Sequence, residues 1–140
     1  MRSQMHVRLA ETGDVLLESH VYVSSPSVHL IVNPDGRLTI SGAPPVRRFR
    51  PSADWLFESA AASFCERHIA IVLSGMLSDG AQQLRAVKRM GGMVLAQSPS
   101  DATFPDMPMA AIATGYVDQI LSIDDMLDAI VEEVGNLTSS

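Results

Sequence analysis

A short apolar run at residues 69–73 leads directly into the turn sequence Ser74-Gly75-Met76-Leu77-Ser78-Asp79-Gly80, and the turn leads into an amphipathic segment at 81–90. The run is short and rich in β-branched residues, which predicts a buried strand, whereas the segment after the turn predicts a helix. Asp79 is therefore expected at the carboxyl end of a strand. In open α/β sheets, ligands bind at this edge. Asp79 also has a plainer interpretation, as a helix cap that accepts backbone N–H bonds.

The rest of the chain alternates predicted strands with predicted helices. We expect strands at 20–23, 69–73, 93–96 and 116–121, a hairpin of 29–32 with 37–40, and helices at 52–64, 79–90, 107–114 and 123–134. Asp35-Gly36 lies between alternating apolar residues, which is a strong hairpin signal. Strands that alternate with helices form right-handed βαβ units. The prediction is an α/β fold with a mainly parallel open sheet, flanking helices and a β-hairpin insertion.

Length and composition limit the classes of function that the chain can have. The 140 residues, 46% of them hydrophobic, support one domain over residues 1–140 with a substantial core. A net charge of −6 gives no general attraction to nucleic acid or acidic lipid. No signal peptide and no apolar run near the roughly 20 residues of a membrane span occur, so no membrane insertion is expected. Cys65 is the only cysteine, which excludes an intrachain disulfide and fits a cytoplasmic protein. No metal-ligand spacing appears, and no cofactor is expected.

The only local concentration of basic residues lies in and beside the predicted hairpin. It consists of Arg37, Arg47, Arg48 and Arg50. One interpretation is a solvated loop, and the other is a contact site for an acidic partner.

Several motifs follow one another in a characteristic order. They are the segments 20–23, 29–30, 50–57, 74–80, 91–97, 104–108 and 110–118. In this order, from about Val7 to Ala129, the chain resembles the catalytic domain of CheB-type chemotaxis protein-glutamate methylesterases. The resemblance implies hydrolysis of glutamyl methyl esters, and deamidation of glutamines, on the cytoplasmic helices of chemoreceptors. These helices are the implied partners.

The resemblance also implies roles for two residues. The family uses a Ser-His-Asp triad whose acid lies in a Gly-Met-Gly-x-Asp-Gly turn, and this pattern matches residues 75–80. Asp79 is thereby the match to the triad acid, and the backbone amide of Met76 is the match to an oxyanion-hole donor. Leu77 departs from the pattern, since the family has glycine there. If that glycine adopts a positive φ, a leucine costs about 1–2 kcal/mol or reshapes the turn.

Two further motifs of the family do not occur in these 140 residues. The nucleophilic serine lies in Gly-x-Ser-x-Gly-Gly and the catalytic histidine in Gln-His-Met, both upstream of the part matched from Val7. The four histidines stand in other contexts: His6, His20, His29 and His68. Because the triad acid acts by holding the imidazole, Asp79 without that histidine has no catalytic task.

Ser74 and Ser78 lie close to Asp79 in sequence. A serine nucleophile needs a base within hydrogen-bond reach, and the spacing offers no histidine, because His68 is expected at the opposite end of the sheet. We therefore expect both serines to serve the turn. A newly arisen nucleophile is the alternative.

The absent motifs also have a structural consequence. In the family, the first strand is central, so this chain is expected to form an incomplete, truncated doubly wound methylesterase domain, with either a gap or a collapsed sheet. The apolar residues of 69–73 and 93–96 on the uncovered face then need cover, from self-association or from a complementing N-terminal half. Two functions remain open. The chain is a binding or remnant domain that is inactive alone, or it is the distal half of an esterase completed by another chain.

Overall fold

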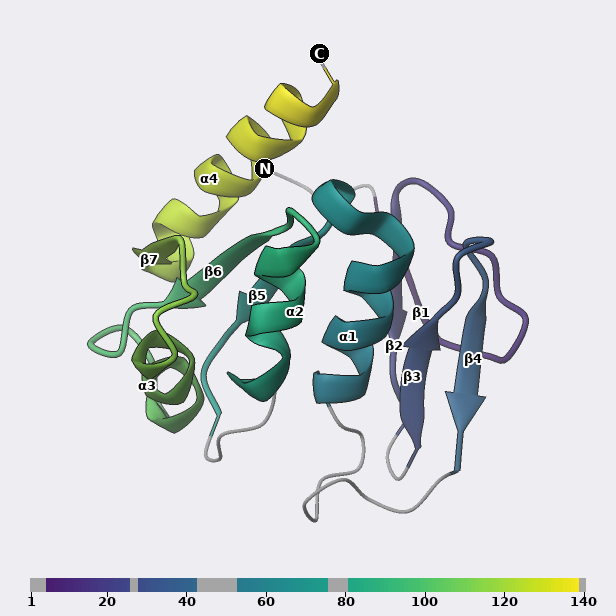
Figure 1. Ribbon diagram of the computed structural model, residues 1–140, viewed down its shortest axis with the longest axis horizontal. Helices are drawn as coiled ribbons and strands as arrows, with labels where there is room; N and C mark the ends of the chain where they lie inside the picture. Colours follow the sequence, from purple (N-terminus) through teal and green to yellow (C-terminus); the bar gives the residue numbers. More distant parts are fainter. Residues whose placement is uncertain (1–4, 26–27, 43–52, 76–80, 139–140) are drawn as a thin grey trace.

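The computed structural model describes residues 5–25, 28–42, 53–75 and 81–138 (Figure 1). The elements, in chain order, are β1 (His6–Leu9), β2 (His20–Val23), β3 (His29–Val32), β4 (Leu38–Ser41), α1 (Ala53–Phe64), β5 (Ile69–Val72), α2 (Leu84–Arg89), β6 (Met93–Gln97), α3 (Asp106–Ala113), β7 (Gln119–Leu121) and α4 (Ile123–Thr138). Short 3₁₀ turns at Cys65–Arg67 and Ala81–Gln83 precede β5 and α2. None of the helices in these ranges is both long and apolar enough to span a bilayer.

The strands form a three-stranded parallel sheet in the order β5-β6-β7, a parallel pair β1-β2 and an antiparallel hairpin β3-β4. This confirms the predicted α/β class, the parallel pairing and the hairpin. Within the described ranges no ladder joins β2 to β5, so of the two expected outcomes, a gap or a collapsed sheet, the structure has the gap. Figure 1 shows α1 and α2 side by side on one side of the strands.

Helix α1 joins two hydrophobic cores. On one side, Phe57 and Ala61 pack with residues of β5, β6, α2 and α3. On another, Ala60 packs with the β3-β4 hairpin, and Tyr22 of β2 lies against the same cluster. The small side chains of α1 permit this close approach on both sides. The helix therefore holds the parallel sheet and the hairpin together in place of a shared strand ladder.

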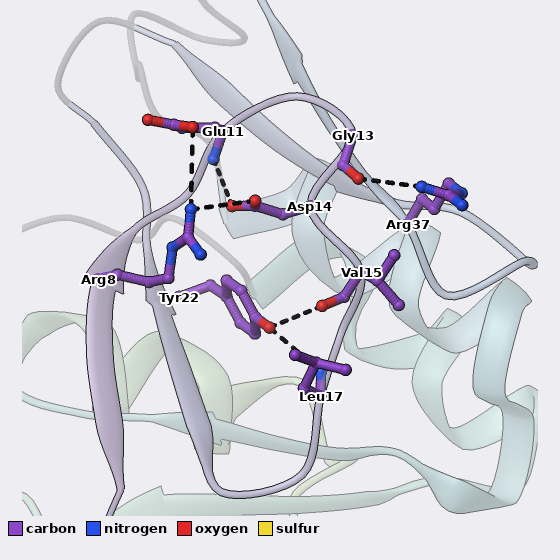
Figure 2. Close-up of polar contacts among 8 residues, drawn as sticks. All are labelled: Arg8, Glu11, Gly13, Asp14, Val15, Leu17, Tyr22 and Arg37. Carbon is purple, nitrogen blue, oxygen red and sulfur yellow. Dashed lines mark hydrogen bonds and ion pairs between the residues drawn. The ribbon is translucent and has the colours of Figure 1, made fainter.

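The loop between β1 and β2 is held by polar side chains (Figure 2). The Tyr22 hydroxyl donates a hydrogen bond to the Val15 carbonyl at 2.7 Å, and Arg8 Nη2 lies 3.2 Å from Asp14 Oδ1. Arg37 Nη1, from the hairpin, donates to the Gly13 carbonyl at 3.2 Å. Of the basic concentration predicted near the hairpin, Arg37 is thus engaged within the chain. The other three arginines lie outside the described residues.

Strand β1 was not predicted. The alternating sequence His-Val-Arg-Leu of β1 carries a period-2 signal, but every residue of the strand is exposed, so no buried face marks it in the sequence. The strand forms by pairing with β2, with His6 opposite His20 and Leu9 opposite Val23 in a parallel register.

Two predicted elements are shorter than expected. The helix predicted at 79–90 is a 3₁₀ turn followed by α2 at Leu84–Arg89, and residues 79–80 lie outside the described part. The strand predicted at 116–121 begins only at Gln119. Just before Gln119, Oδ2 of the Asp118 carboxylate accepts the Val94 N–H at 2.7 Å, in place of a strand carbonyl. Lys88 Nζ lies 2.8 Å from the same oxygen. This side-chain clamp adds to the backbone bond in which the Asp118 N–H donates to the Val94 carbonyl at 2.8 Å.

The uncovered apolar surface agrees with the expected one only at the end of the run 69–73, where Leu73 is 44% exposed. Strand β6 needs no cover, because Val94, Leu95 and Ala96 have no exposed surface between β5 and β7. The β1-β2 pair instead leaves one apolar face in solvent: Val7 is 68% exposed and Leu9 60%, and their register partners Val21 and Val23 are 37% and 43% exposed. Since parallel strands are normally buried on both faces, this face is the unusual surface of the fold.

Candidate functional site

The candidate site lies where β5 ends. The Ser74 amide donates to Gln97 Oε1 at 2.9 Å, and Ser74 Oγ accepts the Phe104 N–H at 2.9 Å. The next amide, of Gly75, donates to the Phe104 carbonyl, also at 2.9 Å. These bonds tie the end of β5 to the loop that leads into α3. The chain is thus fixed in place just before the segment 76–80.

Gly75 is packed against α3. The Met107 N–H donates to the Gly75 carbonyl at 3.1 Å, and the Met107 side chain lies over the Gly75 α-carbon. A β-carbon at this position would overlap Met107 Sδ and lie 2.9 Å from Cγ. Glycine allows this close approach, and a side chain here would force the flexible Met107 side chain to move.

Gln97, at the end of β6, links the loops that follow all three parallel strands. Its side chain is 5% exposed, and its amide Nε2 donates to Asp101 Oδ2 at 3.0 Å. The same oxygen accepts the Ile123 N–H, at the start of α4, at 3.0 Å. The hydrogen bond from the Ile123 N–H lowers the pKa of Asp101 below its usual value, and the bond from Gln97 lowers it by a smaller amount. Burial opposes this shift. The polar chain Ser74–Gln97–Asp101 therefore organises the carboxyl edge of the sheet.

Ser74 is used by the turn. Its hydroxyl bonds the Phe104 backbone in both directions, accepting from N–H and donating to the carbonyl at 3.4 Å. His68 precedes β5 and Ser74 follows it, which separates the two residues by about 20 Å at strand rise. The geometry supports the turn interpretation of Ser74, and no hydrogen bond joins its hydroxyl to a histidine among the residues that the structure describes.

His68 is a half-buried residue at the other end of β5, with its Nδ1 atom buried. Burial lowers the pKa of its ring below the usual range, and Nδ1 has no hydrogen-bond partner among the described residues. The His68 carbonyl accepts the Met93 N–H at 3.0 Å, so the residue pairs β5 with β6 through its backbone. The ring acts as a packed side chain.

The two residues expected to take part in chemistry, Asp79 and Met76, lie outside the described residues, as do Leu77 and Ser78. Their roles stay predictions. The described structure reaches Gly75 on one side of them and Ala81, in the 3₁₀ turn before α2, on the other. In the ranges on either side of these gaps, no group of three or more histidine, cysteine, aspartate or glutamate side chains could hold a metal ion.

Gln97 and Asp101 were not identified as site residues from the sequence. A signal was available, because Gln97 ends the apolar run 93–96 as Ser74 ends the run 69–73. Carboxyl ends of neighbouring parallel strands meet at one edge of a sheet, so polar residues at both ends are candidates for contact.

Comparisons with known proteins agree with this geometry. The sequence model of a family described as CheB methylesterase matches residues 1–130. The chain is 35% identical over 120 residues to protein-glutamate methylesterase/protein-glutamine glutaminase 4 of Myxococcus xanthus (strain DK1622), an alignment that covers 86% of this chain and 34% of that protein. It is 38% identical over 130 residues to protein-glutamate methylesterase/protein-glutamine glutaminase 2 of Anaeromyxobacter dehalogenans (strain 2CP-C), which covers 93% and 38% of the two chains.

A solved structure is also similar. The crystal structure of the Thermotoga maritima CheB methylesterase catalytic domain matches with a TM-score of 0.84 and 26% sequence identity, covering 89% of this chain and 68% of that one. The chain thus spans 34% and 38% of the two curated relatives but most of the fold of the solved domain.

Proposed function

The chain belongs to the CheB methylesterase family, and on this premise we propose that it supplies the acid part of a Ser-His-Asp esterase site. In this proposal, Asp79 holds the imidazole of the catalytic histidine, and the Met76 amide donates to the oxyanion of the tetrahedral intermediate. The substrates are glutamyl methyl esters and glutamine side chains on the cytoplasmic helices of chemoreceptors, and the location is the cytoplasm.

One observation supports this assignment above the others. Ser74 and Gly75 are bound to Phe104 and packed under Met107, so the turn that follows starts from a defined position at the carboxyl edge of the sheet. Triad and oxyanion groups need such rigid support, because displacements near 1 Å cost large factors in rate. A helix cap alone would not need the links from Ser74 through Gln97 to Asp101.

The chemistry requires a serine and a histidine that the family carries in two other motifs. The serine Oγ bonds to the ester carbonyl carbon while its proton moves to the histidine, and the C–O bond to the methoxy group then breaks as methanol leaves with that proton. Water next attacks the acyl-serine, giving the glutamate and regenerating the serine. Glutamine deamidation follows the same steps with ammonia as the leaving group.

Since neither motif occurs in residues 1–140, we propose that these residues by themselves are one truncated domain without esterase activity. The test compares methanol release from a methylated receptor helix by the 140-residue chain alone and by the chain mixed with a family segment that carries both motifs. We expect background rates alone and measurable turnover from the mixture.

Asp79→Asn should abolish the restored turnover, because an asparagine leaves the histidine in the wrong tautomer, at a cost of about 10⁴-fold in kcat. Asp124→Asn, on the exposed first turn of α4, is the matched control and should retain it. Turnover by the chain alone would contradict the proposal of inactivity. Binding of the segment without turnover would favour the other candidate, a binding or remnant domain.

A further inference from the structure

A hollow on the hairpin side of α1 has the chemistry of a site for an arginine side chain. We propose that the hollow lined by Ile31, Trp55, Glu58 and Ser59 binds an arginine of a protein partner. The proposal goes beyond the esterase function, because it involves neither Asp79 nor the serine and histidine motifs.

The hollow is formed where α1 crosses β3. Trp55 and Glu58 lie one helical turn apart on α1, so both side chains reach the same side of the helix, and Ile31 of β3 forms the opposite wall. The volume is about 200 Å³. Small-molecule pockets are typically larger, at roughly 300–1,000 Å³, so the hollow suits a single side chain.

The indole of Trp55 is held in position before any partner binds. It stacks on the ring of His29, with centroids 4.3 Å apart and planes inclined by 28°, and His29 is completely buried. A fixed tryptophan ring favours cation binding, because no side-chain freedom is lost when the cation arrives. The guanidinium of arginine also stacks on aromatic rings, which a lysine ammonium does not.

The charge of Glu58 completes the site. Glu58 is exposed and forms no ion pair or hydrogen bond with any residue that the structure describes. The hydroxyl of Ser59 is already used, since it accepts the Val32 N–H at 2.9 Å and donates to the Leu56 carbonyl at 3.1 Å. The polar group left for a ligand is therefore a carboxylate beside a tryptophan, which matches a guanidinium in charge and shape.

The test uses Trp55 itself as the reporter, because it is the only tryptophan of the chain. The 140-residue chain is titrated with N-acetyl-arginine amide, and the tryptophan fluorescence is recorded at constant ionic strength. We expect a saturable change. N-acetyl-citrulline amide has nearly the same shape without the charge, and we expect at least a tenfold weaker response, on the order of a charge-assisted contact.

A matched pair of variants separates the site from general electrostatics. Glu58→Gln should weaken arginine-amide binding roughly tenfold, whereas Glu66→Gln, an exposed acid beyond the other end of α1, should leave it unchanged. Both positions are exposed, so both variants are expected to fold, which circular dichroism checks. No saturable change, an equal response to the citrulline amide, or an unchanged affinity in Glu58→Gln would overturn the proposal.

Discussion

Met107 occupies the space in which a side chain on Gly75 would lie: a β-carbon there would overlap Met107 Sδ and come within 2.9 Å of Cγ. The two residues are 32 positions apart, and their contact joins the end of β5 to the first turn of α3. A β-carbon at Gly75 would therefore have to displace the Met107 side chain.

Gly75→Ala is therefore expected to destabilise the chain by about 1 kcal/mol, the low end of the cost of overpacking, because the flexible Met107 side chain can shift. Urea unfolding followed by circular dichroism measures the change. Gly42→Ala is the control, because a β-carbon at Gly42 meets nothing within 4 Å. In a Met107→Ala background the cost of Gly75→Ala should shrink, and an unchanged cost there would mean that Met107 is not the cause.

Gln97→Leu should cost about 0.5–1.5 kcal/mol of unfolding free energy, because it removes the acceptor of the part-buried bond from the Ser74 amide and a donor to Asp101. Gln119→Leu, at an exposed position of β7, is the matched control and should change stability little. Equal costs for the two variants would show that the contacts of Gln97 do not support this edge.

The lowered pKa of Asp101 predicts that the folded chain loses stability in acid. Its pKa is lowered in the folded chain by the bonds from Ile123 and Gln97, so their stabilisation is complete above the usual value of 3.8 and is lost as the pH falls through the lower folded pKa. Asparagine does not ionise, so the unfolding free energy of the Asp101→Asn variant should lack this part of the pH dependence. Urea unfolding at a series of acid pH values checks it, with Asp128→Asn on α4 expected to retain the wild-type profile.

The lowered pKa of His68 predicts a second effect of pH on stability, at higher pH than that of Asp101. Burial lowers the pKa of the folded-state ring, so below the usual value of 6.5 the unfolded chain takes up a proton that the folded chain resists. Stability should therefore fall as the pH decreases from 6.5 toward the folded pKa. His68→Gln should flatten this slope. If the slope persists in His68→Gln, it arises from another group.

The exposed face of the β1-β2 pair predicts self-association of the isolated chain. Val7→Thr with Leu9→Thr places β-branched threonine at both strand positions and removes much of the apolar surface, so light scattering should report a smaller mean mass and a hydrophobic dye should bind less. Met109→Thr, at a residue of α3 that is 54% exposed, is the control. A monomer in the unsubstituted chain that binds no dye would contradict this prediction.

Elements marked by local pattern were predicted well. The β3 strand was predicted with the bounds found, His29–Val32, and the helix predicted at 52–64 is found as α1 at Ala53–Phe64, with residue 52 outside the described residues. Elements without such a pattern were not predicted. Strand β1 has no buried face, and in the first part of the predicted strand at 116–121 the Asp118 side chain clamps Val94.

The amino-acid sequence by itself determined the alternation of strands and helices, the Asp-Gly hairpin and the turn pattern that carries Asp79, because periodicity and turn chemistry depend on neighbouring residues. The tertiary structure decided which residues support that turn. Ser74 meets Gln97 across 23 positions and Gly75 meets Met107 across 32, and such contacts depend on how strands pair and helices cross. The surface left uncovered was decided in the same way. Val94, Leu95 and Ala96 of the central strand β6 are buried, whereas Val7 and Leu9 of β1, in a separate two-strand pair, remain exposed.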